Sequence, residues 1–297
     1  MKNSNTVKED WNAVIAEKLK EGISIEDLAH EYPSGILIEP NVMGSDIEKY
    51  NHSISVSKPW INMASINGGS SSDKNKLALL ALQQGANGLS FELSSQDSIL
   101  DILKDILTSY LDVRIDCSQL SSEEIAKQKS LVNQSYYPNL RWIDNSDNYV
   151  QCFIEENDRI QSIKRCIDSL KSNARIDVIL SLSKNLLFEI ASLRALRALL
   201  EESNVQSFNI LARYEVEGTN ELGDYNLIEK TYKVLSGILG GANAILTPYT
   251  GDEDSRLTLN IHNVLDLESG MKNVLDPLGG SYYIEKLTGE IISKVKL

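Results

Sequence analysis

The sequence predicts an α/β fold: a (β/α)8 TIM-like barrel with one degenerate unit, preceded by an N-terminal helical arm. Two observations carry this prediction. From residue 58 onward, short apolar runs of strand length alternate with longer segments in which apolar residues recur every three or four positions. Counting these runs gives about eight strands with helices between most of them, which fits a (β/α) barrel better than an open sheet.

The arm is an amphipathic helix near the N-terminus. Between residues 7 and 20, apolar residues recur at helical spacing: Trp11, Val14, Ile15 and Leu19. A polar stretch, 41–57, follows it, so we expect residues 1–57 to form the arm and linker and residues 58–297 to form the barrel domain. The apolar stripe has to pack on another surface, and both a partner chain and its own barrel domain are open at this point.

The expected strands are apolar runs bounded by turn-forming residues: 61–66, 88–93, 111–117, 140–144, 175–182, 207–214 and 242–247. An eighth run, 149–154, follows its predecessor too closely for a crossover helix. We therefore expect it to form a hairpin with that predecessor or to belong to an irregular loop.

The clearest helix covers residues 185–202, with Ser183 as the expected N-cap. Its apolar positions are spaced by three or four: Leu186, Ile190, Leu193, Leu196 and Leu200. Glu201 and Glu202 lie unfavourably at the negative end of the helix dipole, so this end is expected to fray or to find a basic neighbour.

Charge and composition exclude several classes of partner. A net charge of −13 and a pI near 4.8 oppose binding to nucleic acid or to an anionic membrane surface. No apolar run is long enough to cross a bilayer, and the polar start lacks a signal-peptide core, so a cytoplasmic protein is expected. Cys117, Cys152 and Cys166 show no C-x-x-C pairing, which predicts reduced thiols rather than a disulfide framework or a zinc site.

Several residues suggest chemistry but have a simpler interpretation. His262 is expected on the flank or surface of an amphipathic helix. The turn 67–70 precedes a helix but lacks the P-loop lysine, so it is expected to be an ordinary barrel turn. The acidic run 252–254 is expected to cap a helix rather than bind a cation. Asp144 and Asp147 would make a carboxylate pair only if they faced one another, which the sequence does not show.

The most distinctive stretch is Asp276-Pro277-Leu278-Gly279-Gly280-Ser281-Tyr282-Tyr283-Ile284-Glu285. Its residue types predict a chain reversal followed by a short β-prone run, Tyr282-Tyr283-Ile284. Its order resembles the end of the acyl-CoA-binding barrel in the methylmalonyl-CoA mutase family. We interpret eight residues as family-signature positions with a structural role: Asp276, Pro277, Gly279, Gly280, Ser281, Tyr282, Tyr283 and Glu285.

Three other blocks resemble the same family in the same order. The first comprises Lys58-Pro59-Trp60, Asn67-Gly68-Gly69-Ser70 and residues 85–91, and is similar to the family's first two barrel strands. Residues 188–197 are similar to a family helix, and Leu239-Gly240-Gly241-Ala242-Asn243 to the start of the last strand. The resemblance implies a split barrel threaded by the CoA arm of the substrate, with adenosylcobalamin held over it by a separate C-terminal domain.

The residues that the family uses for chemistry are not found at the matching positions. None of His30, His52 and His262 fits the D-x-H-x-x-G cobalamin motif, and the chain ends at Leu297, which is expected to leave no space for a cobalamin domain. The family's catalytic tyrosine position falls on Ser65 or Ile66, and the region 143–150 contains no histidine. We therefore assign no catalytic, cofactor-binding or metal-binding residue to this chain.

The resemblance then implies a non-catalytic small subunit that stabilises a catalytic large subunit in a heterodimer. Adenosylcobalamin is expected on the large subunit, and the heterodimer would interconvert methylmalonyl-CoA and succinyl-CoA. Two alternatives stay open: the substrate-barrel half of a split acyl-CoA mutase, and a stand-alone acyl-CoA-binding module.

Overall fold

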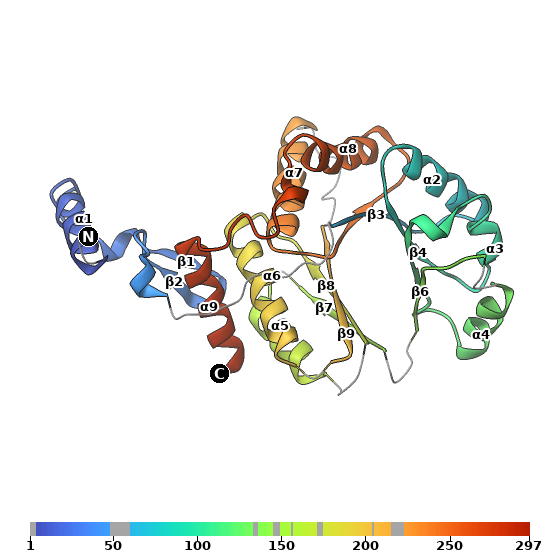
Figure 1. Ribbon diagram of the computed structural model, residues 1–297, viewed down its shortest axis with the longest axis horizontal. Coiled ribbons are helices and arrows are strands. Elements are labelled where there is room, and N and C mark those ends of the chain that lie inside the picture. Colours follow the sequence, from blue (N-terminus) through green and yellow to red (C-terminus); the bar gives the residue numbers. More distant parts are fainter. Residues whose placement is uncertain are drawn as a thin grey trace.

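The computed structural model describes residues 4–47, 60–132, 136–144, 149–155, 157–170, 175–203, 205–214 and 223–297. Lys58, Pro59, His52 and Asp147 lie outside these ranges. Within them, eight parallel strands form one sheet in the order β6-β5-β4-β3-β10-β9-β8-β7. Because the first barrel strand, β3, pairs with the last, β10, the sheet curls into a barrel that stays unpaired at one seam, between β6 and β7 (Figure 1).

Each of the predicted strands is present. They are β3 (Ile61–Ile66), β4 (Gly88–Glu92), β5 (Asp112–Asp116), β6 (Leu140–Ile143), β7 (Tyr149–Ile154), β8 (Arg175–Ser181), β9 (Ser207–Arg213) and β10 (Ala244–Pro248). The expectation of a hairpin or an irregular loop at residues 149–154 is wrong. β7 pairs with β8 in parallel, from Tyr149 opposite Arg175 to Ile154 opposite Leu180. The barrel is therefore complete in strand number, although its β6–β7 unit lacks a crossover helix.

Helices surround the barrel: α2 (Ser71–Gln83), α3 (Ile99–Ile102), α4 (Ser122–Leu131), α5 (Arg159–Asp168), α6 (Leu186–Glu201), α7 (Gly223–Leu239), α8 (Glu253–Leu267) and α9 (Tyr282–Lys296). Local signals fix where they begin. Ser70 caps α2 by accepting a hydrogen bond from the backbone N of Asp73, as expected for an ordinary turn. The cap of α6 is Asn185 and not Ser183, whose hydroxyl accepts from the Asn185 backbone instead. Glu202 finds a basic neighbour, Lys296, at 2.7 Å.

The N-terminal segment lies beside α9 at one end of the molecule (Figure 1). It contains α1 (Ser4–Ala16) and a short antiparallel hairpin, β1 (His30–Tyr32) and β2 (Ile36–Ile38), with 3-10 turns at Glu26–Leu28, Pro33–Gly35 and Gly44–Asp46. The hairpin side chains Tyr32, Ile36 and Ile38 belong to the main apolar core. By contrast, α1 is held by ion pairs from Lys8 to Glu39 and Asp46, and Val14 on its apolar stripe is 53% exposed.

The β-prone run Tyr282-Tyr283-Ile284 is not a strand, because it forms the first turn of α9. Two further 3-10 turns, Thr108–Tyr110 and Met271–Asn273, lie in connections. The helical spacing of the buried residues Ile284, Leu287, Ile291 and Val295 along α9 outweighs the local preference of three residues. α9 packs on α6 and α5, outside the barrel.

Apolar residues form two clusters between the strands and the surrounding helices, and a third inside the barrel: Met63, Ile179, Leu211, Ala244 and Leu246. One glycine shows how closely the outer layer packs. A Cβ at Gly240 would lie 2.6 Å from the Cδ1 atom of Leu193, so α7 can end against α6 only with glycine there. Cys117, Cys152 and Cys166 are buried and free.

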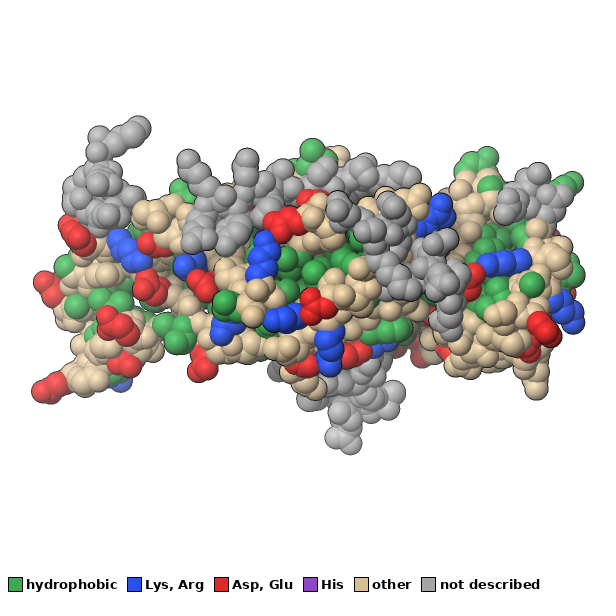
Figure 2. Space-filling view, turned by 90° about the horizontal axis from the view of Figure 1, so that it is seen from below, with side chains coloured by type: hydrophobic (Ala, Val, Ile, Leu, Met, Phe, Trp, Pro, Cys, Tyr) green, Lys and Arg blue, Asp and Glu red, His purple; other side chains and the backbone are tan. Residues whose placement is uncertain are grey.

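Two surface properties bear on partners. None of the helices in the described ranges is long and apolar enough to cross a bilayer. On the face drawn in Figure 2, the visible Lys and Arg side chains are interspersed with Asp and Glu rather than gathered into one basic area.

Candidate functional site at the mouth of the barrel

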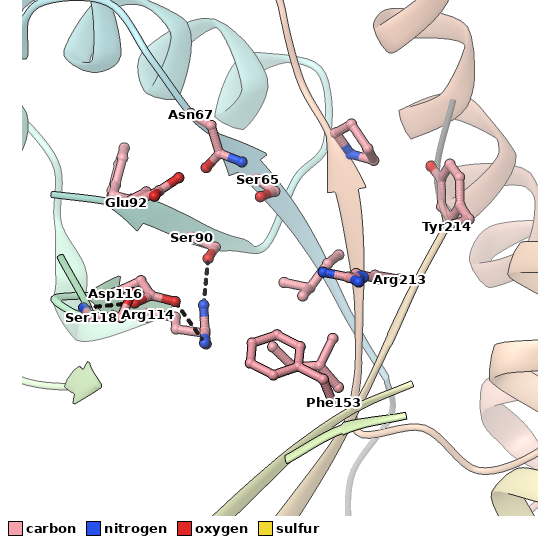
Figure 3. A pocket seen from close by; sticks show the side chains of 14 residues that line it. Ser65, Asn67, Ser90, Glu92, Arg114, Asp116, Ser118, Phe153, Arg213 and Tyr214 are labelled. Carbon is pink, nitrogen blue, oxygen red and sulfur yellow. Dashed lines mark hydrogen bonds and ion pairs between the residues drawn. The ribbon is translucent and has the colours of Figure 1, made fainter. Parts of the chain in front are cut away.

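A pocket of about 640 Å³ opens where the carboxyl ends of the barrel strands meet, the position at which TIM barrels place their sites. We call it the mouth pocket. Its polar lining comes from four strands and their loops: Ser65, Asn67, Ser90, Glu92, Arg114, Asp116, Ser118 and Arg213. Figure 3 shows Ser90 and Arg114 on one side and Arg213 and Phe153 pointing in from the other.

Charged side chains of the mouth pocket are held in pairs. Arg114 donates to Asp116 Oδ2 at 3.2 Å and to Ser90 Oγ at 3.4 Å, and Asp116 also accepts from the backbone N of Ser118. Across the pocket, Arg213 donates to Glu155 Oε1 at 3.2 Å and stacks over the ring of Phe153, with 5.6 Å to its centroid. The pocket therefore holds balanced charges rather than a field of one sign.

Below the mouth pocket, the barrel axis is filled by side chains. Arg114 Nε lies 3.8 Å from Asp177 Oδ2, and Asp177, 1% exposed, also accepts a hydrogen bond from Asn209 at 3.0 Å. We call this ion pair, together with the apolar cluster inside the barrel, the axial plug. Beneath it is a second cavity of about 650 Å³, the base pocket, whose lining includes Arg141, Asp177 and Asn209.

The side chains at the two candidate positions for the family's tyrosine point to opposite faces of β3. Ser65 lines the mouth pocket, whereas Ile66 is buried in the outer apolar cluster. Asp144 forms an ion pair with Lys129 at 2.5 Å. Of the acidic run 252–254, Asp252 caps α8 by accepting from the Ser255 backbone at 2.8 Å, as predicted. Among the described residues, no three His, Cys, Asp or Glu side chains come together as a metal site.

His262 is not at the surface, which corrects the expectation from its helix. Its side chain is 1% exposed, and Nε2 lies 3.1 Å from Thr247 Oγ1, on the face of β10 that packs against α8. Nδ1 has no hydrogen-bond partner among the described residues. Burial lowers the pKa of His262 to about 3, so the imidazole is neutral in the folded protein.

The burial of His262 predicts a loss of stability in mild acid. The unfolded chain binds a proton near pH 6.5, and the folded chain does not until about pH 3. The free energy of unfolding therefore keeps its full value, as far as His262 determines it, above pH 6.5. Below that it falls by about 1.4 kcal/mol per pH unit as the pH drops toward 3. Urea unfolding at pH 7 and pH 5, where most carboxylates stay ionised, measures it. His262→Gln should flatten the dependence, and an unchanged slope in that variant would contradict the assignment.

The signature residues lie on the outer side of α6, away from the mouth pocket. The guanidinium of Arg194, 2% exposed, donates to Asp276 at 2.8 Å and 3.1 Å and to Glu285 at 2.8 Å. We call these three side chains the Arg194 cluster. The other signature residues shape the turn into α9: Pro277, Gly279, Gly280 (φ +82°), Ser281 as the N-cap, half-exposed Tyr282 beside Gly44, and Tyr283, whose hydroxyl lies 3.0 Å from that of Tyr32.

Helix α6 also contacts the block at residues 239–243. Arg197 donates to the carbonyl of Gly241 at 2.7 Å and to Asn243 Oδ1 at 2.9 Å. Phe188 stacks on Tyr32 of the hairpin, with 5.8 Å between the centroids. The blocks at residues 188–197, 239–243 and 276–285 are thus joined around one helix, and their contacts are those of a scaffold.

The charged residues of the mouth pocket were not predicted from the sequence. A signal was present in β5, where Asp112, Arg114 and Asp116 alternate with the buried apolar residues Val113 and Ile115. Alternation of this kind, in a strand covered by helices on its outer face, indicates charged side chains inside the barrel.

Known proteins match the C-terminal half of the chain. A family model described as methylmalonyl-CoA mutase matches residues 160–296. The methylmalonyl-CoA mutase of Rhizobium meliloti (strain 1021) is 29% identical over 137 residues, covering 40% of this chain and 19% of that protein. The 2-hydroxyisobutanoyl-CoA mutase large subunit of Aquincola tertiaricarbonis is 34% identical over 77 residues, covering 24% and 14%. The matched part is therefore less than a fifth of the length of these relatives.

Among solved structures, a dipeptide epimerase from Methylococcus capsulatus aligns with a TM-score of 0.36 at 11% identity, over 63% of this chain and 54% of that one. The match to the mutase model begins in α5 and ends in α9, so it contains the Arg194 cluster and both partners of Arg197. These matches show that residues 160–296, from α5 to α9, are similar to the methylmalonyl-CoA mutase family.

Proposed function

We propose that the chain is a cytoplasmic, non-catalytic small subunit that forms a heterodimer with a complete, adenosylcobalamin-binding mutase chain and stabilises it. The axial plug carries this proposal. A CoA arm passing along the barrel would have to displace the Arg114–Asp177 ion pair and the side chains of Met63, Ile179 and Leu246. Displacing them would separate two opposite charges in a buried setting, which is costly.

The mouth pocket supports the same conclusion. Its nearest equivalent to the family's catalytic tyrosine is Ser65, whose hydroxyl does not replace a phenol as an acid. The name of the Aquincola relative, a mutase large subunit, describes a protein that has at least one further kind of subunit. An assembly of unlike chains is therefore reasonable for this family.

The arm provides a surface for the partner. On α1, Val7 is 41% exposed and Val14 53%, while Lys8 holds the helix through its ion pairs with Glu39 and Asp46. An apolar helix face that its own domain leaves open is suited to binding a groove on another chain.

Co-expression with the complete mutase chain of the same organism tests the proposal. We expect a one-to-one complex by native mass spectrometry, and we expect Val14→Asp to weaken it at least about 10-fold, because a carboxylate would enter an apolar contact. Leu107→Asp changes an exposed residue that follows α3, at the end of the molecule opposite α1, and serves as the control (Figure 1). A chain that stays monomeric beside an active partner would contradict the proposal.

Calorimetry with methylmalonyl-CoA separates the proposal from its alternatives. With the axial plug in place, the isolated chain is expected to show no heat of binding. Saturable binding would favour the split-mutase or the acyl-CoA-binding alternative. Turnover of methylmalonyl-CoA after a separate cobalamin-binding chain is added would then select the split mutase.

A further inference from the structure

The mouth pocket has polar groups that the fold does not use. The hydroxyls of Ser65 and Ser118 and the carboxamide of Asn67 line it, and none of the three makes a side-chain hydrogen bond to another described residue. Asn67 and Ser65 enter from the β3 side, and Ser118 follows β5 (Figure 3). These groups present neutral donors and acceptors to whatever fills the pocket.

Both arginines of the pocket are already paired with carboxylates. Arg114 is paired with Asp116 and Arg213 with Glu155, whereas Glu92 accepts a hydrogen bond from the neutral side chain of Gln119. An anionic ligand would meet the carboxylate of Glu92, and to bind an arginine it would have to break one of these pairs and leave a carboxylate uncompensated. A neutral ligand could instead hydrogen-bond to the free groups and to the unused lone pairs of the carboxylates.

The remaining lining is apolar. Phe153 is 49% exposed, and Leu246 and Pro248 come from β10, where Leu246 pairs with Arg213 of β9. Such a pocket combines apolar and aromatic surface with a few convergent polar groups. It suits a compact ligand that has apolar C–H surface on its faces and hydrogen-bonding groups around its edge. The axial plug closes the pocket from below, which limits the ligand to its volume of about 640 Å³.

We propose that the mouth pocket binds a small, neutral polyol of the size of a monosaccharide. Its hydroxyl groups would bind Asn67, Ser65 and Ser118, and its C–H surface would lie against Phe153. This site is separate from the surfaces assigned to the partner subunit, so it does not depend on the proposed function.

Ligand-observed NMR titration of the purified chain with D-glucose, myo-inositol and D-glucose 6-phosphate tests the site. We expect at least one of the two neutral compounds to bind saturably, and glucose 6-phosphate to bind at least about 10-fold more weakly than glucose because its charge meets paired groups. Saturable binding of neither neutral compound, or tighter binding of the phosphate than of glucose, would overturn the proposal.

Two variants locate the binding. Asn67→Ala and Ser118→Ala each remove a side chain without a partner in the fold, so both should fold normally and each should weaken binding about 5-fold. Gln206→Ala, an exposed residue of the base pocket, is the matched control and should leave binding unchanged. Wild-type affinity in both mouth variants, or an equal loss in the control, would show that the compounds bind elsewhere.

Discussion

Replacing Arg159 by alanine is expected to lower the free energy of unfolding by about 3–5 kcal/mol. Arg159 and Glu189 join α5 to α6, and both side chains are 0% exposed. Arg159 Nη2 donates to both carboxylate oxygens, at 2.7 Å and 2.8 Å, and to the carbonyl of Ser181 at 2.6 Å. The variant would leave a carboxylate and a carbonyl without partners in a dry interior, which is why the expected loss is large.

Urea unfolding at pH 7 measures this loss, and α5 provides a matched control. Arg165 forms an ion pair with Asp158 at 2.8 Å, but the two side chains are 69% and 50% exposed. Arg165→Ala should therefore cost less than about 1 kcal/mol. The double variant Arg159→Met with Glu189→Leu should recover much of the loss, because it removes both charges and refills the space. Equal effects of Arg159→Ala and Arg165→Ala would contradict the assignment.

The strand positions could be predicted from the sequence because barrel strands carry apolar, β-branched side chains toward the surrounding helices. In β8, Ile176, Val178 and Leu180 face the outer layer while Asp177 and Ile179 face the barrel axis. A run such as 175–182 is therefore recognisable whatever its neighbours are. The pairing of residues 149–154 was predicted wrongly. The prediction assumed that two parallel strands are always joined by a crossover helix, which needs a longer connection than the one before β7.

Contacts between distant segments could not be predicted in this way. Arg114 and Asp177 meet across the barrel axis, and neither strand indicates the charge on the other. His262 has the spacing of a helix flank, yet the outward-facing Thr247 provides a buried partner for it. In α9, the helical spacing of Ile284, Leu287 and Ile291 was visible in the sequence, but the preceding glycines and tyrosines favoured a turn and strand.

The contacts of the signature residues lead to the second large effect. Arg194→Met is expected to lower the free energy of unfolding by about 2–4 kcal/mol, because Asp276 and Glu285 would then face one another without the cation between them. Asp276 and Glu285 are partly hydrated, at 12% and 13% exposure, which places the expected loss below that of Arg159→Ala.

Lys296→Met separates a scaffold role of the Arg194 cluster from a general contribution of charge on α9. Lys296 also links α9 to α6, through Glu202 at 2.7 Å, but both side chains are about half exposed, so its loss should cost less than about 1 kcal/mol. Adding Glu285→Gln to Arg194→Met should restore part of the stability, since it removes one of the two facing carboxylates. If Arg194→Met and Lys296→Met unfolded at the same urea concentration, the signature would need an explanation other than the attachment of α9 to the barrel.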